Sequence, residues 1–534
     1  MNVNILILDF LKDNKPYMIF YLIFIISYPI SSVLLPQYYS KVIDDIKNNK
    51  NPAFKKLLLF FLISNSMFLA LDKIDTVFIP KLQSFIRKNI VKSVLNTYKN
   101  NFEEQDLGIA ISQIVKFPLV VKDLARQYRN YIIPLIFIMI GVLIKFYNIN
   151  KKIAILFLSL LLISTGILYP FYIKVKNLSI NLDKDTDSIH ENISEMFDNL
   201  MDIYSMNMID KELDELEKYQ KELIERYKTT FNKTNNLRAL IQILSVFIFM
   251  SCMFLSYKMM KNNEIPHEDV ITIFIMSMFV IKKIGGFAGE LPDFIFNIGI
   301  YNKISENLSK LKENKKDQNI KENFLIKEGS ISFENISIIY DKKEILKNFS
   351  LNIKPRESII ILGKIGSGKS SLIKSLLKLI KFNGNIYIDG VNTKNISITD
   401  IRSGILYIRQ NPLPFNRTFY ENVMYGIENI TKTDVDKIFL KYNLKTFFDK
   451  DLNAKVGRKG NNLSGGQRMI MFLLRILIHD NKKIIILDEP TSSLDDDTSI
   501  IIMNIIKDIV KNQTTIIITH DTRLSNIVDR IIKL

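Results

Sequence analysis

Residues 359–370 read IIILGKIGSGKS, an apolar run followed by a glycine-rich loop that ends in lysine and serine. The apolar run predicts a buried strand, and the residues after the loop predict a helix from about Ser371 to Lys381. Glycines between a strand and a helix let successive backbone N–H groups point inward and bind phosphate at the helix N-terminus. The pattern predicts a P-loop in which Lys369 reaches the β- and γ-phosphates of a nucleotide and the Ser370 hydroxyl binds Mg²⁺.

Two further apolar runs end in residues that can act on a bound nucleotide. Lys482–Leu487 predicts a strand that ends in the carboxylates of Asp488 and Glu489, and Thr515–Thr519 predicts another that ends at His520. In open α/β sheets, ligands bind at the carboxyl ends of the strands. We therefore expect Asp488 to hold Mg²⁺ through water and Glu489 to polarise the attacking water.

A third motif, Leu463-Ser464-Gly465-Gly466-Gln467, lies between the P-loop and Asp488. With its motifs in this order, the chain resembles an ATP-binding cassette (ABC) exporter of the half-transporter type, similar to the multidrug, lipid and peptide exporters of subfamily B. The resemblance implies a six-helix α-helical transmembrane domain, type I exporter-like, followed by an α/β P-loop NTPase nucleotide-binding domain. It also implies ATP and Mg²⁺ as cofactors.

The resemblance assigns roles to individual residues. It implies that Glu489, His520 and Gln410 are catalytic, and that Ser370, Gln410 and Asp488 bind Mg²⁺. The resemblance also implies that Tyr340 stacks on adenine and that Asp495 is part of the D-loop at a dimer interface. The full set implied to bind ATP is Tyr340, Gly363, Gly366, Ser367, Gly368, Lys369, Ser370, Ser371, Ser464, Gly465, Gly466, Gln467 and Asp495.

The resemblance further implies that two subunits share each ATP, which lies between the P-loop of one and Ser464–Gly466 of the other. The motif begins a helix, so its N–H groups and dipole would meet the γ-phosphate. A second half-transporter is therefore an expected partner. A homodimer is favoured because Glu489, His520 and the motif are intact, and a heterodimer stays open. Turns near residues 102–107 and 205–212 are implied to dock on the cassette as coupling helices.

The hydrophobic first half predicts membrane spans, each of which needs about 20 mostly apolar residues. Six stretches fit: about Tyr17–Tyr39, Phe54–Phe78, Tyr131–Tyr147, Ile153–Ile173, Leu240–Tyr257, and one that runs from Val270 past Gly285-Gly286. Residues 81–130 and 174–238 are charged and amphipathic, which predicts helices that continue beyond the bilayer. We expect a transmembrane domain over residues 1–312, a linker over 313–327, and a nucleotide-binding domain over 328–534 on the cytoplasmic side.

Several charged residues fall within or near the predicted spans. Asp72 and Asp75 lie at the end of the second, and Lys282 and Lys283 lie midway along the sixth. Charge inside a membrane is costly and suggests a functional site. The alternative is that these helices have left the bilayer there, or that the lysines reach out to its surface. If Lys282 and Lys283 line a substrate cavity, they favour an anionic group.

The net charge of +17 does not by itself predict a nucleic-acid partner. Lysine is spread over the whole chain, and no basic cluster alternates with aromatic residues as in a single-strand channel. Scattered lysines suit the anionic head groups of a lipid bilayer better. We expect an ATP-driven exporter of a lipid, a peptide or an amphipathic small molecule. The alternative is an ATPase of the same family that regulates a partner channel or receptor.

Overall fold

The computed structural model describes residues 3–47, 51–52, 54–99, 107–310, 323–340, 343–364, 366–448, 451–479, 481–492 and 494–534. The chain forms two compact units, which are described separately. The first comprises Met1–Leu95 and Gln105–Glu313, and the second comprises Asn96–Glu104 and Asn314–Leu534. Most of the predicted linker, residues 313–327, lies outside the described residues.

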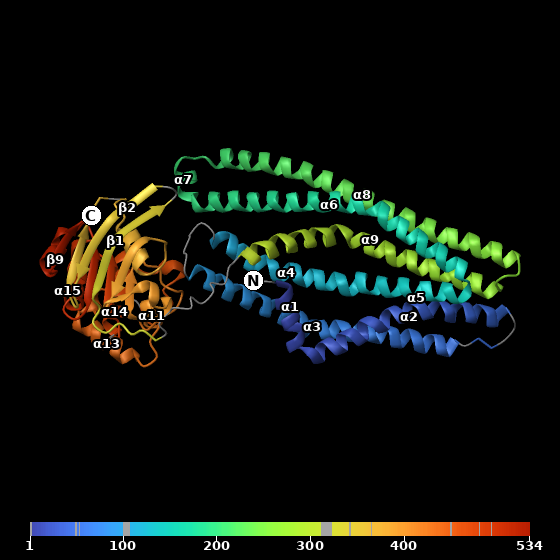
Figure 1. Cartoon of the computed structure of the whole chain (residues 1–534), viewed down its shortest axis with the longest axis horizontal. Coiled ribbons are helices and arrows are strands. Elements are labelled where there is room, and N and C mark those ends of the chain that lie inside the picture. Colours follow the sequence, from blue (N-terminus) through green and yellow to red (C-terminus); the bar gives the residue numbers. More distant parts are fainter. Residues whose placement is uncertain are drawn as a thin grey trace. The chain divides into compact units, whose positions relative to one another are not determined.

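The first unit is built from long helices (Figure 1). Their bounds are α1 Val3–Asp13, α2 Lys15–Lys47, α3 Phe54–Tyr98, α4 Leu107–Gln127, α5 Ile133–Ile149, α6 Lys151–Asp198, α7 Leu200–Ser205, α8 Ile209–Lys261 and α9 His267–Lys310. The π-helical turn η2, Tyr128–Ile132, joins α4 to α5 without a break. Figure 1 shows α6 and α8 side by side, with the short α7 joining their ends.

Five helical stretches of the described chain are long and apolar enough to cross a membrane. They are Phe54–Thr97, Ile111–Ile149, Lys151–Asp198, Ile209–Lys261 and His267–Ser309. Each contains one of the last five predicted spans and continues well beyond it. The first predicted span, Tyr17–Tyr39, lies in α2, whose side chains are described only in part.

The carboxylates at the end of the second predicted span have a buried partner. Arg129, on the π-helical turn, is 6% exposed and pairs with Asp72 at 3.1 Å and with Asp75. Its Nε also donates to the Asn130 side chain at 2.7 Å. Because burying an unpaired charge is expensive, the guanidinium ties η2 to α3. One guanidinium thus pairs with two carboxylates, the half-exposed Asp72 and the buried Asp75.

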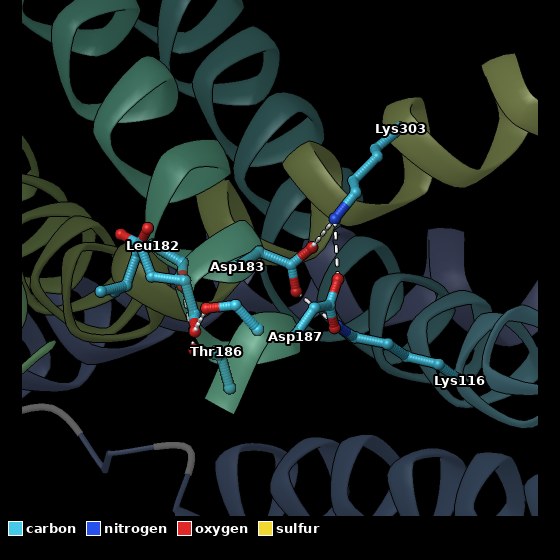
Figure 2. Close-up of polar contacts among 8 residues, drawn as sticks. Lys116, Leu182, Asp183, Thr186, Asp187 and Lys303 are labelled. Atoms are coloured by element: carbon cyan, nitrogen blue, oxygen red, sulfur yellow. Dashed lines mark hydrogen bonds and ion pairs between the residues drawn. The ribbon is translucent and has the colours of Figure 1, made fainter. Parts of the chain in front are cut away.

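A second charge cluster links α4, α6 and α9 (Figure 2). Lys303 Nζ lies 3.0 Å from Asp183 and 2.8 Å from Asp187. Lys116 also pairs with both carboxylates, at 3.2 Å to Asp187. The Asp183 side chain is 3% exposed and the Asp187 side chain is 42% exposed. Two lysines from different helices thus share two carboxylates one turn apart on α6.

We expect Asp183→Asn to lower the unfolding temperature of the detergent-solubilised protein. The new amide would turn N–H groups towards Lys116 and Lys303, and lost hydrogen bonds to charged groups cost on the order of 1–3 kcal/mol. Asp187→Asn is the matched control, because its more exposed carboxylate is screened by water. The unfolding temperatures are measured by the fluorescence of an added dye, because the protein has no tryptophan. Equal unfolding temperatures for the two variants would contradict this account.

The second unit contains two described sheets. The antiparallel sheet has the order β2-β1-β4-β5, and the parallel sheet has the order β6-β7-β8-β3-β9. The strands are β1 Ile331–Tyr340, β2 Lys343–Ile353, β3 Ser358–Leu362, β4 Asn383–Ile388, β5 Val391–Asn392, β6 Ile405–Ile408, β7 Ile484–Asp488, β8 Thr514–Ile518 and β9 Arg530–Lys533. The helices are α10 Lys369–Leu376, α11 Ile398–Gly404, α12 Phe419–Val423, α13 Lys432–Lys441, α14 Gly465–Ile478 and α15 Asp496–Ile509, with 3₁₀ turns at η3 Thr393–Asn395, η4 Leu444–Thr446, η5 Arg458–Gly460 and η6 Thr522–Ile527.

The central strands of the parallel sheet are buried on both faces. Every residue of β7 and β8 is buried, as continuous apolar runs in a parallel sheet require. The helix after the P-loop differs from the prediction, because α10 begins at Lys369 and ends at Leu376. The chain reverses just afterwards at Lys378, whose φ of 51° is incompatible with a continuing helix.

Candidate functional site

The site is built at one edge of the parallel sheet. Strands β6, β7, β8 and β3 are parallel neighbours, so their carboxyl ends meet at the same edge. Gln410 follows β6, Asp488 and Glu489 end β7, His520 follows β8, and the P-loop follows β3. Residues that are far apart in the sequence are thereby brought to one edge.

The lysine of the P-loop donates hydrogen bonds to the backbone of the loop itself. Lys369 Nζ donates to the carbonyl oxygens of Gly363 at 2.6 Å and Lys364 at 3.0 Å. A Cβ at Gly363 would lie 2.9 Å from the backbone oxygen of Leu534, so no larger residue fits there. Gly366 and Gly368 have φ values of 83° and 92°, which favour glycine.

The loop fits an anion. The Ser367 hydroxyl is buried and has no hydrogen-bond partner among the described residues. Such a buried polar group is costly unless a ligand or water satisfies it. Ser371 follows in the first turn of α10, whose N-terminal N–H groups also lack partners within the helix. Phosphate oxygens would satisfy these donors.

Asp488 lies beside the P-loop helix. Its Oδ2 accepts hydrogen bonds from the Tyr407 hydroxyl at 3.0 Å and from the Ser370 hydroxyl at 3.4 Å. Burial raises the pKa of the Asp488 carboxyl, while these two hydrogen bonds and the charge of Lys369 act in the opposite direction. Tyr407 did not emerge from the motif analysis, although its place on the strand before Gln410 could have suggested it.

Glu489 and His520 face each other across β7 and β8. His520 Nε2 lies 3.2 Å from Glu489 Oε1, and the His520 backbone N–H donates to Glu489 Oε2 at 3.3 Å. Glu489 has a φ of 48°, so the chain turns directly after Asp488. That turn explains how two consecutive carboxylates can both face this edge of the sheet.

The motif at 463–467 begins α14. Ser464 caps the helix: its hydroxyl accepts from the Gln467 backbone at 3.1 Å, and the Gln467 side chain accepts from the Ser464 backbone at 3.0 Å. A Cβ at Gly466 would lie only 2.3 Å from Thr498 Cγ2, whereas one at Gly465 would make an ordinary 3.8 Å contact with Leu494. Packing among the described residues therefore explains why residue 466 is glycine, but it does not explain why residue 465 is.

Gln410 lies beside the start of α14. It lines a pocket of about 390 Å³ together with Gly465, Arg468, Ser492 and Leu494.

Asp495 caps α15, where its carboxylate accepts from the Thr498 backbone at 2.8 Å and from the Thr498 hydroxyl at 2.7 Å. These hydrogen bonds hold the pKa of the Asp495 carboxyl below its usual value. The side chain of Tyr340, at the end of β1, lies outside the described residues.

Comparisons with known proteins define the class. Residues 346–492 match the model of the ABC transporter ATPase region, described as "ABC transporter", and residues 18–283 match the model of the "ABC transporter transmembrane region". The chain belongs to the ABC transporter family. It is an ATP-hydrolysing exporter of the half-transporter type and a multi-pass integral membrane protein, with its ATPase domain outside the membrane domain.

Relatives match over the whole chain or over part of it. A putative export ATP-binding/permease protein of Rickettsia typhi is 26% identical over 97% of this chain and 91% of its own length. The ATP-dependent lipid A-core flippase of Neisseria gonorrhoeae is 33% identical over 38% of this chain and 34% of its own length. ABC transporter B family member 2 of Dictyostelium discoideum is 32% identical over half of this chain, a match that spans 20% of that longer protein.

A solved structure has the same fold. A bacterial Atm1-family ABC exporter with ATP bound aligns over 97% of this chain and 93% of its own, with a TM-score of 0.83 and 16% identity. The predicted fold class, a helical transmembrane domain followed by an α/β nucleotide-binding domain, is confirmed.

Proposed function

We propose that two copies of this chain form an ATP-driven exporter in which ATP binding and hydrolysis at two shared sites drive alternating access. The main support for this proposal is that the chain carries two partial nucleotide sites, each of which is incomplete by itself. The P-loop, Asp488, Glu489 and His520 gather at one sheet edge, while Gly465 opens α14 at a position that no described residue of its own chain requires to be glycine. A partner's γ-phosphate approaching this helix N-terminus would require it.

Each residue at the sheet edge has a proposed task. Lys369 and the loop N–H groups bind the phosphates, and Ser370, Asp488 and Gln410 would hold Mg²⁺. Bound Mg²⁺ would neutralise charge that develops on the phosphates. Glu489 accepts a proton from the attacking water, and His520 holds the Glu489 carboxylate in place. Tyr340 is proposed to stack on the adenine.

The α6–α7–α8 end offers a surface for coupling. Phe197, Met201, Tyr204 and Met206 are 59–80% exposed there, next to a pocket of about 460 Å³. Exposed apolar groups that lie together mark an interaction surface. We propose that this end, including residues 205–212, docks on an ATPase domain. The other proposed coupling turn, residues 102–107, lies almost wholly outside the described residues.

The substrate is proposed to be a lipid, a peptide or an amphipathic small molecule. The flippase relative acts on a lipid, which supports a lipid for this chain. Lys282 is exposed, and a Cβ added at Gly285 or Gly286 would meet nothing within 4 Å. This open face of α9 supports a place for Lys282 and Lys283 along the substrate path, where they would favour an anionic group.

The test is ATP hydrolysis by the chain purified alone in lipid nanodiscs. We expect Mg²⁺-dependent hydrolysis without any other protein, and stimulation by a lipid or amphipathic compound that is then moved across liposomes. A folded preparation that binds ATP but does not hydrolyse it would contradict the homodimer. Export would be contradicted if the protein hydrolysed ATP without moving the compound and instead changed the ion flux through a channel reconstituted with it.

A further inference from the structure

Tyr407 has a place in the sheet that no motif predicts. It lies on β6 opposite Ile486 of β7, and Asp488 is two residues further along β7. Side chains two residues apart on a strand share one face. The long phenol of Tyr407 can therefore reach diagonally to the Asp488 carboxylate, on the face where the P-loop helix packs.

The contact is specific to one oxygen. The Tyr407 hydroxyl donates to Asp488 Oδ2 at 3.0 Å, and the longer hydrogen bond from Ser370, at 3.4 Å, goes to the same oxygen. A tyrosine hydroxyl has an ordinary pKa of about 10, so it carries its proton at neutral pH and can act as the donor. Asp488 is 8% exposed, so few waters can replace this donor.

We propose that Tyr407 is a positioning residue that acts on the metal site through Asp488. Its hydroxyl fixes Asp488 through Oδ2 and leaves Oδ1 free to accept from a water of hydrated Mg²⁺. The inference rests on the proposed function, in which Ser370 is itself a metal ligand. The position of the Ser370 hydroxyl would depend on the metal that it ligates, whereas the Tyr407 hydroxyl holds Asp488 whether or not the metal is bound. Groups that orient a metal ligand in this way contribute strongly to metal affinity.

The test compares Tyr407→Phe with Tyr442→Phe, both in a Glu489→Gln background that keeps ATP intact. Tyr442 is the matched control, since its hydroxyl donates to Asp508 at 2.8 Å in the same kind of tyrosine–aspartate pair away from the sheet edge. Mn²⁺ binding to the nanodisc protein with stoichiometric ATP is followed by electron paramagnetic resonance. ATP affinity is measured separately in EDTA.

We expect Tyr407→Phe to weaken Mn²⁺ binding by about tenfold while ATP affinity in EDTA stays unchanged, which also shows that the P-loop remains folded. Tyr442→Phe should match the parent in both. Mn²⁺ affinity within twofold of the parent for Tyr407→Phe would overturn the proposal, as would an equal loss in Tyr442→Phe or a loss of ATP affinity in EDTA. A parent that binds ATP but no Mn²⁺ would instead contradict the proposed Mg²⁺ site.

Discussion

Glu489→Gln is expected to reduce ATP hydrolysis by about 10²–10⁴-fold, the usual contribution of a general base. The amide keeps the size of the side chain and can still accept the backbone N–H of His520, so the sheet edge should stay intact. It cannot take a proton from the attacking water. ATP binding by the P-loop should therefore be unchanged, and the variant should accumulate with ATP bound.

The measurement is phosphate release together with fluorescent-nucleotide binding in nanodiscs. Glu428→Gln makes the same chemical change at an exposed residue in the turn between α12 and α13, and should retain the parent rate. Hydrolysis by Glu489→Gln at more than a tenth of the parent rate would assign the base to another residue.

Gly465→Asp is expected to abolish hydrolysis in a protein that still folds. A Cβ at Gly465 makes only an ordinary contact in its own chain, and an acidic residue in the first turn of α14 suits the helix dipole. In the closed dimer, however, its charge would face the partner's γ-phosphate. Two like charges about 4 Å apart repel by about 4 kcal/mol at an effective dielectric constant of about 20, which corresponds to roughly 10³-fold.

Two further variants separate the effect of the charge from the effect of bulk. Gly465→Asn adds the same bulk without the charge and should lose much less activity. Gly466→Ala should instead lower the unfolding temperature, because its Cβ would overlap Thr498, and overpacking costs about 1–3 kcal/mol. Nucleotide binding, ATP-dependent dimer cross-linking and thermal unfolding separate the three variants. Normal cross-linking by Gly465→Asp would contradict the proposed sharing of ATP between subunits.

Local sequence patterns predicted much of this architecture. The run that ends in Lys369 and Ser370 combines an apolar strand with glycines, and those properties lie within a few consecutive residues. The strand ends at Asp488 and His520 could be placed at one edge because parallel strands share an edge. The helices that contain the last five predicted spans likewise follow from long apolar runs.

Long-range contacts were beyond such patterns. Lys116, Asp183 and Lys303 look like ordinary charges on amphipathic helices, and only the packing of α4, α6 and α9 brings them together. The early end of α10 was also missed, because it depends on a chain reversal at Lys378 rather than on the helical preferences of the residues after it.

The sequence by itself determined that the chain carries a P-loop ATPase after a set of membrane helices, because glycine, charge and apolar periodicity are local properties. Only the tertiary structure decided why two adjacent glycines differ and which hydroxyl holds Asp488. Gly466 is required by contact with Thr498 and Gly465 is not, and Tyr407 reaches Asp488 only through the register of β6 on β7. These are distances between residues far apart in the chain, which the folded sheet and its helices alone establish.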